Sequence, residues 1–336
     1  MKAHITIKDL ARELDISPST VSRALKDHPD ISPETKRQVK ELAERLHYKP
    51  NLIAQGLRKS KTNTLGVIVP ELIHFFFSTV ISGIENIAYA RGYNVILCQS
   101  DENYDREVTD TRALWNSRVD GMLVSLSRQT TRYNHFQELL DEGLPIVFFD
   151  RVTDKLKTSQ VIVDDYLGAY KAVELLINKG CKHIVHLAGP ETLEISKNRL
   201  QGYADALKSN GFAVNNNYIH TCPQGTHDES KALTLKILAA HPEIDGIFAC
   251  NDMAALGSIL ALQEKNIAIP GQVKVIGFSD WQLSSLIKPR LTTVSQAGYE
   301  MGQEAASILI DEIEAKGEIV QVKKVISTKL IERETT

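Results

Sequence analysis

The sequence predicts a small all-α head followed by an α/β core of two doubly wound parallel-sheet subdomains. Three observations lead to this fold class. Three capped helical stretches lie between residues 6 and 48. From Leu65 onward, short apolar runs alternate with helical stretches, as in βαβ units. This alternation passes through two successive sets of strands, and 336 residues with 43% hydrophobic composition are enough to bury a core in each.

Helix start and stop signals predict two short helices joined by a tight turn over residues 6–25, TIKDLARELDISPSTVSRAL. Thr6 with Asp9 three residues later forms a capping box, and Ser17 before Pro18 marks the start of the second helix. Apolar residues recur at helical spacing, which leaves Arg23 on the outer side. This pattern predicts a helix-turn-helix unit, whose second helix enters the DNA major groove. An ordinary helical hairpin inside a larger core is the alternative.

A third helix and a basic linker follow this unit. Residues 34–48 predict a helix that closes a three-helix core over the first two. In the linker, Asn51 can cap a short helix, and Leu57 stands beside the cations of Arg58 and Lys59. An apolar side chain flanked by cations suits a wedge that enters the minor groove and kinks the duplex. The alternative is a flexible tether whose leucine packs on the core.

Charge is unevenly distributed along the chain. Residues 1–62 carry 13 Lys and Arg against 8 Asp and Glu, whereas the remainder carries 26 against 34, for a formal net charge of -3 overall. A basic head on an acidic body suits contact with a polyanion. The start of the chain lacks the apolar run of a signal peptide, and no later stretch approaches a membrane span. We therefore expect a cytoplasmic protein without membrane contact.

Catalysis and metal binding have no support in the sequence. The four cysteines, at 98, 181, 222 and 250, are far apart and lack zinc-ligand spacing, so buried free thiols are expected. No G-x-S-x-G, H-E-x-x-H or Gly-rich phosphate loop after a strand is present. We expect no enzyme activity, no cofactor and no metal.

The alternating elements of the core can be placed individually. Expected strands lie at 65–70, 93–98, 120–125 and 145–150 in the first set, and at 183–188, 218–221, 246–250 and 273–278 in the second. Expected helices lie at 78–91, 105–117, 134–142, 167–179, 197–210, 228–240 and 253–265. A last helix at 299–316 follows the second set, so the chain crosses back to the first. Ligands of such sheets bind at the carboxyl ends of the strands, here in a cleft between the two subdomains.

These elements define the expected domains. The helix-turn-helix head takes residues 1–49, and the linker with its hinge helix takes 50–63. The first core subdomain takes 64–163 plus about 292–318, and the second takes 164–291 plus about 319–336.

The chain resembles the lactose/galactose repressor (LacI/GalR) family over essentially its whole length. The segments that carry the resemblance are TIKDLARELDISPSTVSRAL, YKPNLIAQGLRKSKTNTLGVIVP, VDGMLVS, PIVFFDR, FACNDMAALG, VIGFSD, LTTV and LIERE, in this order. Members are homodimeric regulators whose core is similar to a periplasmic sugar-binding protein fused to a DNA-binding head. The resemblance implies a sequence-specific transcriptional regulator, specifically a repressor, that binds a double-stranded DNA operator.

The resemblance assigns DNA-binding roles by position. Pro18 and Ser19 match the variable base-reading positions, and Arg23 matches a recognition-helix position that reads a base in several members. Because Pro18 has no donor, we expect Arg23 to make the bidentate contact to guanine. Leu57 matches the hinge leucine that intercalates at the operator centre. Capping, phosphate and hinge positions complete the set: Thr6, Ser17, Thr20, Ser22, Asn51, Gln55 and Arg58.

The resemblance also implies an effector site in the cleft. Arg199 matches the arginine that grips the ligand in many relatives, and the other matching positions are Phe76, Phe77, Asp150, Asn251, Asp252, Ser279 and Asp280. The chain departs from the family at three places: His74 and Phe75 replace Asn-Pro, Ser279 replaces an aspartate, and Thr226 replaces a stacking aromatic. Losing that aspartate removes a fork that accepts two hydroxyls, so an ordinary monosaccharide clamped there becomes doubtful, although Asp280 or Trp281 can compensate.

The expected function is a repressor that binds a near-palindromic operator as a homodimer. A small-molecule effector, a sugar or a sugar derivative, controls it from the cleft. A protein co-regulator in place of the small molecule is the first alternative, and the missing aspartate supports it. A solute-binding receptor is the second, but the absent signal peptide and the capped helices of the head oppose it.

Overall fold

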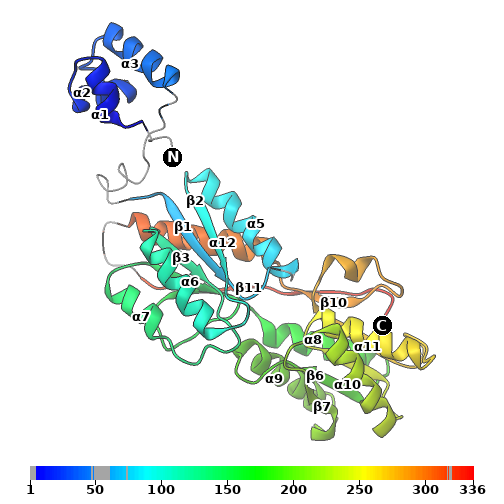
Figure 1. The fold of residues 1–336 in the computed structure, drawn as a ribbon. Helices are drawn as coiled ribbons and strands as arrows, with labels where there is room; N and C mark the ends of the chain where they lie inside the picture. The colour runs from blue at the N-terminus through cyan, green and yellow to red at the C-terminus, as the bar shows by residue number, and fades with distance from the viewer. Residues whose placement is uncertain (1–4, 47, 49–60, 73–74, 316, 318–319) are drawn as a thin grey trace. The chain divides into compact units, whose positions relative to one another are not determined.

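The computed structural model describes residues 5–46, 48, 61–72, 75–315, 317 and 320–336 (Figure 1). The chain divides into two compact units, Met1–Asn63 and Thr64–Thr336. The first is the head and the second is the core, and each is described by itself.

The head consists of three short helices around one small core. They are α1 (Ile7–Glu13), α2 (Pro18–Leu25) and α3 (Pro33–Arg45). Each contributes residues that are fully or almost fully buried, including Leu10, Val21 and Val39. These are the apolar positions at helical spacing in the sequence, so the expected three-helix head is confirmed.

The first sheet of the core is parallel throughout and covered on both faces. Its strand order is β11-β5-β4-β3-β1-β2. The strands are β1 (Thr64–Val69), β2 (Asn94–Gln99), β3 (Gly121–Val124), β4 (Ile146–Phe149), β5 (Ser159–Val163) and β11 (Lys323–Ile326). Helices α5 (Phe75–Ala90) and α12 (Gly298–Glu314) share one apolar cluster with the strands, and α6 (Tyr104–Asn116) and α7 (Asn134–Asp141) share another. Successive strand residues enter opposite clusters, which explains the continuous apolar runs of the sequence.

Close packing of α5 on α12 fixes the return of the chain to this sheet. A Cβ atom on Gly83 would lie 2.1 Å from the carbonyl oxygen of Tyr299, and one on Gly302 would lie 2.0 Å from that of Val80. Both glycines are therefore required by a direct backbone approach of the two helices.

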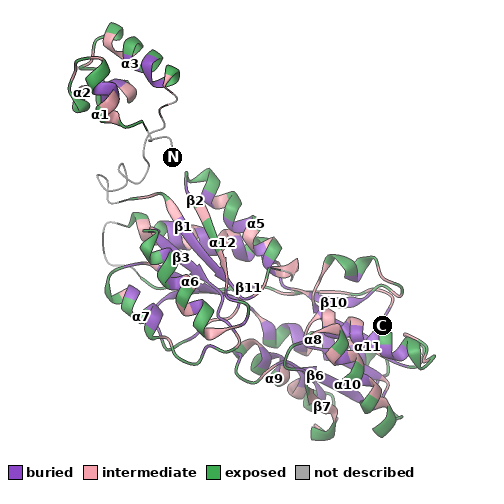
Figure 2. Cartoon of the chain, in the orientation of Figure 1, coloured by how far each residue is buried: buried purple, intermediate pink, exposed green. Residues whose placement is uncertain are grey.

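The second sheet repeats the plan with one antiparallel edge. Its strand order is β12-β10-β9-β8-β6-β7, and β12 pairs antiparallel with β10. The strands are β6 (Ile184–Ala188), β7 (Ile219–Thr221), β8 (Gly246–Ala249), β9 (Lys274–Ser279), β10 (Thr292–Ser295) and β12 (Lys329–Ile331). Helices α8 (Asp165–Asn178) and α9 (Glu194–Ser209) cover one face, and α10 (His227–Ala240) and α11 (Asp252–Glu264) cover the other. In Figure 2 the inner strands of both sheets are buried, and the outer faces of the helices are exposed.

Sheet membership corrects the expected subdomain boundaries at two places. β10 lies in the second sheet, although residues from about 292 were assigned to the first subdomain. β11 lies in the first sheet, although residues from about 319 were assigned to the second. The chain thus crosses between the sheets after β5, between β10 and α12, and between β11 and β12. Four-residue strands such as TTVS and KKVI show strand character in sequence but not which sheet they join.

Membrane-spanning helices and metal clusters are absent from the described residues. None of their helices is both long and apolar enough to cross a membrane. No group of three or more His, Cys, Asp or Glu side chains among them is arranged to hold a metal ion. All four cysteines lie in the described part and are free thiols.

Candidate DNA interface and effector cleft

The start of α2 is fixed by hydroxyl groups. Ser17 Oγ accepts the backbone N–H of Thr20 at 3.1 Å, and Pro18 occupies the first helical position. The hydroxyls of Ser19 and Thr20 lie 2.7 Å and 2.8 Å from the same Ser17 oxygen. Three hydroxyls therefore surround the positive end of this helix, which suits a phosphate oxygen.

The outer face of α2 carries the predicted reading residues. Ser17, Pro18, Ser19 and Arg23 are exposed, whereas Thr20 and Ser22 are half-buried. Within the described residues, the Arg23 side chain has no hydrogen bond or ion pair. By contrast, cations on α3 are neutralised inside the head: Arg37 by Glu34 and Glu41, Lys40 by Asp27, and Arg45 by Glu13. The structure therefore leaves Arg23 available for a base or a phosphate.

Thr6 serves the start of α1. Its backbone N–H and its hydroxyl both donate to the carboxylate of Asp9, at 2.9 Å and 2.6 Å. These hydrogen bonds lower the pKa of Asp9, so the carboxylate stays ionised at the helix N-terminus. Both Thr6 donors are occupied, and the capping role assigned from the sequence is present. The hinge assignments, Asn51, Gln55, Leu57 and Arg58, lie outside the described residues and stay predictions.

In the core, the carboxyl ends of β6, β8 and β9 form what we call the second wall. Its predicted residues are Arg199, Asn251, Asp252, Ser279 and Asp280. The Arg199 guanidinium donates from Nε to Asp165 at 2.8 Å and from Nη1 to the carbonyl of Cys250 at 2.6 Å. It also stacks on the Phe278 ring, 3.8 Å from its centroid. Burial raises the pKa of Asp165, and Arg199 opposes that rise.

The other residues of the second wall are also engaged. Asn251 caps α11 by accepting the Ala254 N–H at 2.7 Å. Asp252 is 2% exposed and accepts from the Trp281 N–H and from the hydroxyls of Ser284 and Thr293. Asp280 pairs with Arg333 at 2.7 Å. These contacts hold the loop after β9 in place, which leaves the carboxylates of Asp252 and Asp280 already occupied.

The carboxyl ends of β2, β3 and β4 form the first wall, which is built differently. Asp150 follows β4 and is 5% exposed, with one long hydrogen bond from Gln296 Nε2 at 3.4 Å. Burial raises the pKa of Asp150 to about 6, although Arg151 opposes the rise. Phe77 is buried below the Arg151 guanidinium, 5.9 Å from it, and meets Phe76 edge to face at 5.3 Å. His74 lies outside the described residues.

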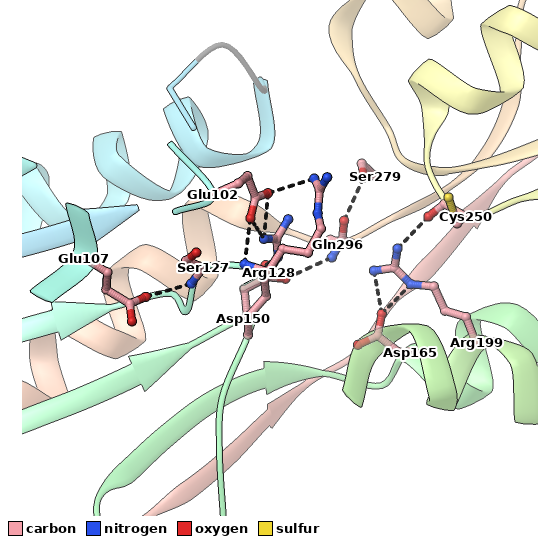
Figure 3. A network of polar contacts seen from close by, with 11 residues as sticks. Glu102, Glu107, Ser127, Arg128, Asp150, Asp165, Arg199, Cys250, Ser279 and Gln296 are labelled. Carbon is pink, nitrogen blue, oxygen red and sulfur yellow. Dashed lines mark hydrogen bonds and ion pairs between the residues drawn. The ribbon is translucent and has the colours of Figure 1, made fainter. Parts of the chain in front are cut away.

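The first wall also contains a charged cluster that the sequence did not reveal. Arg151 Nη1 donates to both oxygens of Glu102 at 2.8 Å, and Arg128 Nη2 donates to Glu102 at 3.0 Å (Figure 3). Burial opposes ionisation of Glu102, but the two guanidiniums outweigh it and lower its pKa. Three serines of this wall, Ser100, Ser125 and Ser127, carry buried hydroxyl groups without a partner. A polar residue directly after an apolar strand was the available signal, but Glu102 lies three residues beyond β2 and Arg128 lies four residues beyond β3.

A hydrogen-bond chain connects the two walls. Ser279 Oγ donates to Gln296 Oε1 at 2.7 Å, and Gln296 Nε2 donates to Asp150. Gln296 is 3% exposed and lies between β10 of one sheet and α12 of the other. Asp150 is also within electrostatic reach of Asp165 and Arg199. The structure thus brings Asp150, Arg199 and Ser279 to one junction of the two subdomains. Thr226 instead caps α10.

Comparison with protein families identifies this architecture. Residues 6–51 match the model of bacterial regulatory proteins of the lacI family. Residues 62–334 match the model of periplasmic binding proteins and sugar binding domain of the LacI family, which is more than half of the chain. The chain belongs to the LacI family. LacI-family proteins are DNA-binding transcriptional regulators with an effector-binding domain, and they are not enzymes; the chain is such a regulator.

Individual LacI-family relatives extend over nearly the whole chain. It is 34% identical over 309 residues to catabolite control protein A of Priestia megaterium, covering 91% of this chain and 92% of the relative. A solved complex of the transcriptional regulator CelR with cellobiose is 27% identical, with a TM-score of 0.75 and coverage of 99% and 100%. The Lac repressor dimer bound to operator and an anti-inducer has the same fold, with a TM-score of 0.87 at 23% identity and coverage of 99% of each chain.

Proposed function

We propose that this LacI-family regulator is a repressor that binds a near-palindromic operator as a homodimer in the cytoplasm. The observation that carries the proposal is the outer face of α2. There, exposed Arg23 has no partner within the described residues, and three hydroxyls crowd the helix start. Such a face suits one bidentate base contact flanked by phosphate contacts.

Exposed apolar side chains support the dimer. β2 is an edge strand of the first sheet, and its Ile96 and Leu97 are 38% and 37% exposed. On the second subdomain, Leu283 and Leu286 follow β9 and are 40% and 65% exposed. Apolar groups left open on both subdomains suit a symmetric contact between two copies along the length of the core.

We further propose that a small molecule of the carbohydrate class binds at the junction of the two walls and changes operator affinity. Arg199, Asp150 and Ser279 come from different elements and meet there, and Gln296 links the two subdomains. The CelR relative is solved in complex with cellobiose, which supports a carbohydrate as the class of ligand. A ligand that favours one arrangement of the subdomains shifts the head's operator affinity by linkage.

Selection of bound sequences from random DNA, with the full chain, tests the proposal. We expect enrichment of two half-sites related by a near two-fold axis, and a dimer in sedimentation velocity at the same concentration. Enrichment of a single unrepeated site, or no enrichment at all, would contradict it. Repetition with a panel of sugars and sugar derivatives should identify ligands that change the recovered fraction. If none does, a protein co-regulator becomes the better account of control.

A further inference from the structure

We propose that the effector is an anionic polyhydroxylated molecule, such as a sugar phosphate or a sugar acid, whose anionic group is held by Arg128 and Arg151. This inference rests on the proposed effector site and specifies the chemistry of its ligand. Four features of the two walls lead to it: unpartnered donors, two guanidiniums that share one carboxylate, an occupied second wall and one carboxyl group with a single long hydrogen bond.

The first wall presents hydrogen-bond donors without acceptors. The Nε–H groups of Arg128 and Arg151 are buried and have no hydrogen-bond partner among the described residues, and neither do the hydroxyls of Ser100, Ser125 and Ser127. Ser100 and Ser125 stand on either side of the end of β1, since their backbone N–H groups bond to Val69 and Ile68. Buried polar groups without partners are uncommon in proteins, because each costs about 1–3 kcal/mol. Five such atoms at one sheet edge indicate a ligand rich in acceptor oxygens.

The two cations of the first wall face the carboxyl groups of Glu102 and Asp150, but only Glu102 lies within hydrogen-bond distance of them. Two guanidiniums share the single carboxylate of Glu102, at 2.8 Å from Arg151 and 3.0 Å from Arg128. The side chains of Arg128 and Arg151 are only 22% and 13% exposed. Glu102 binds a terminal nitrogen of each guanidinium and so fixes both side chains, while their buried Nε–H groups have no acceptor among the described residues. A planar Nε–Nη edge suits the fork geometry of phosphate or carboxylate oxygens.

Among the described residues, the carboxylates of the second wall that could repel such an anion are each engaged by a partner. Ser279 carries a hydroxyl where sugar-binding relatives have an acid, and this hydroxyl donates to Gln296. Asp280 is paired with Arg333, and Asp165 with Arg199. Asp252 accepts from three neutral donors, so these carboxylates are all engaged by partners inside the second subdomain.

Asp150 supplies the remaining part of the specificity. Its carboxyl has a single hydrogen bond at 3.4 Å, and Arg151 Nε lies 4.0 Å away, beyond hydrogen-bond distance. A ligand hydroxyl would satisfy this acceptor. An anion bound by the arginines would in turn raise the proton affinity of Asp150 and limit repulsion between them. Together these groups select a molecule that has both hydroxyls and an anionic group.

Isothermal titration calorimetry of the full chain with matched ligands tests the inference. The pairs are glucose against glucose 6-phosphate, ribose against ribose 5-phosphate, and glucose against glucuronate, with inorganic phosphate as the control for anion binding without a polyol. We expect one or more anionic members to bind at least tenfold more tightly than the neutral member and than phosphate. A preference for a sugar phosphate over glucuronate, or the reverse, distinguishes the two anions. Equal or tighter binding of every neutral member, or no binding of any ligand, overturns the inference.

Three variants assign the effect to the first wall. Arg128→Gln and Arg151→Gln should each lower the affinity for the anionic ligand at least tenfold. Arg112→Gln, on the exposed side of α6, is the control and should not change it. Arg151→Lys keeps the charge and should recover part of the affinity, which separates a ligand contact from a loss of folding. Equal affinity of Arg151→Gln and the unchanged chain contradicts the inference. Operator binding is measured in the same preparations. If only a neutral sugar releases the operator, the proposed function stands and this inference is wrong. If the chain binds no operator at all, the proposed function itself is wrong.

Discussion

The two walls of the core are built from the same position in the same fold, yet they use their polar groups in opposite ways. In the second wall, Arg199, Asp252 and Asp280 are each occupied by partners inside that subdomain. In the first wall, the Nε–H groups of Arg128 and Arg151 and three serine hydroxyls have no partner within the part of the chain that the structure describes. Under our proposal, the second wall acts as a rigid support, and the first wall is the surface that recognises the ligand.

The head shows the same contrast on a smaller scale. Cations of α3 are neutralised by acidic side chains of the head, but Arg23 on α2 is not paired with any described residue. In both units we assign recognition to cations that keep a donor without an acceptor among the described residues: Arg23 in the head, and Arg128 and Arg151 in the core. Substitutions of paired and unpaired groups test this difference. The expected changes in the free energy of unfolding or binding range from several kcal/mol down to about one.

The largest effect should come from breaking the buried pair of the second wall. Arg199→Ala leaves Asp165 buried without its partner, and the loss of a partner from a buried pair costs about 3–5 kcal/mol. We expect the free energy of unfolding to fall by this amount in urea titrations. Lys197→Ala on the same helix removes an exposed pair and should change it by less than about 1 kcal/mol. Similar losses in both variants would show that the second wall is no support.

Asp150 should make stability depend on pH. Its pKa is about 6 in the folded chain, against 3.8 for the ordinary carboxyl, so its stabilising contribution is complete below 3.8 and is lost as pH rises through about 6. Asp150→Asn removes this loss. The free energy of unfolding of the variant, relative to the unchanged chain, should therefore increase by up to about 3 kcal/mol between about pH 4 and about pH 7. Asp228→Asn, at a side chain that is 87% exposed, is the control and should show no such trend.

Arg23 should carry base discrimination in the head. Arg23→Ala is expected to relax the preference at one base pair of each half-site by about 1–3 kcal/mol, measured by competition between operator variants. Arg37→Ala removes a cation that is already paired and should leave the preference unchanged. A uniform loss of affinity over all operator sequences would instead mark Arg23 as a phosphate contact.

The smallest effect should come from adding a charge to the second wall. Ser279→Asp places a carboxylate beside Gln296, where it faces the bound anion, so the affinity for the anionic ligand should fall about tenfold, or about 1.4 kcal/mol. The neutral member of the same ligand pair should bind at least as well as before. Ser285→Asp adds the same charge at an exposed site and serves as the control. Tighter binding of the anionic ligand to Ser279→Asp would contradict the assignment.

Helix caps and other signals between close neighbours in sequence made much of this fold predictable. The Ser17 cap with Pro18 and the Thr6–Asp9 box each join residues that are close neighbours in sequence, so their spacing alone predicts where α1 and α2 begin. Apolar runs covered by helices identified both sheets in the same way. By contrast, β5 (SQVIV) was not predicted as a strand, and the sheets joined by β10 and β11 were assigned the wrong way round. Their membership is decided by contacts between distant segments.

The residues of the candidate effector site also fall into those that the sequence predicted and those that only the fold brings together. Asp150 and Arg199 could be named because family position marks them, but their partners could not. Glu102, Arg128 and Arg151 come from three separate loops, and only the folded sheet brings them together. The internal pairing of Asp280 with Arg333 near the end of the chain was likewise invisible in sequence, and it makes Asp280 a poor substitute for the missing aspartate.

The most direct test of the account is the change in operator affinity that a ligand causes in two chains. Fluorescence anisotropy with the selected operator gives the ratio of Kd values with and without the tightest-binding anionic ligand, for the unchanged chain and for Arg151→Gln. We predict that this ratio of Kd values differs from unity at least tenfold in the unchanged chain. In Arg151→Gln it should be close to unity at the same ligand concentration. Equal ratios in the two chains would contradict the claim that the first wall reads the effector.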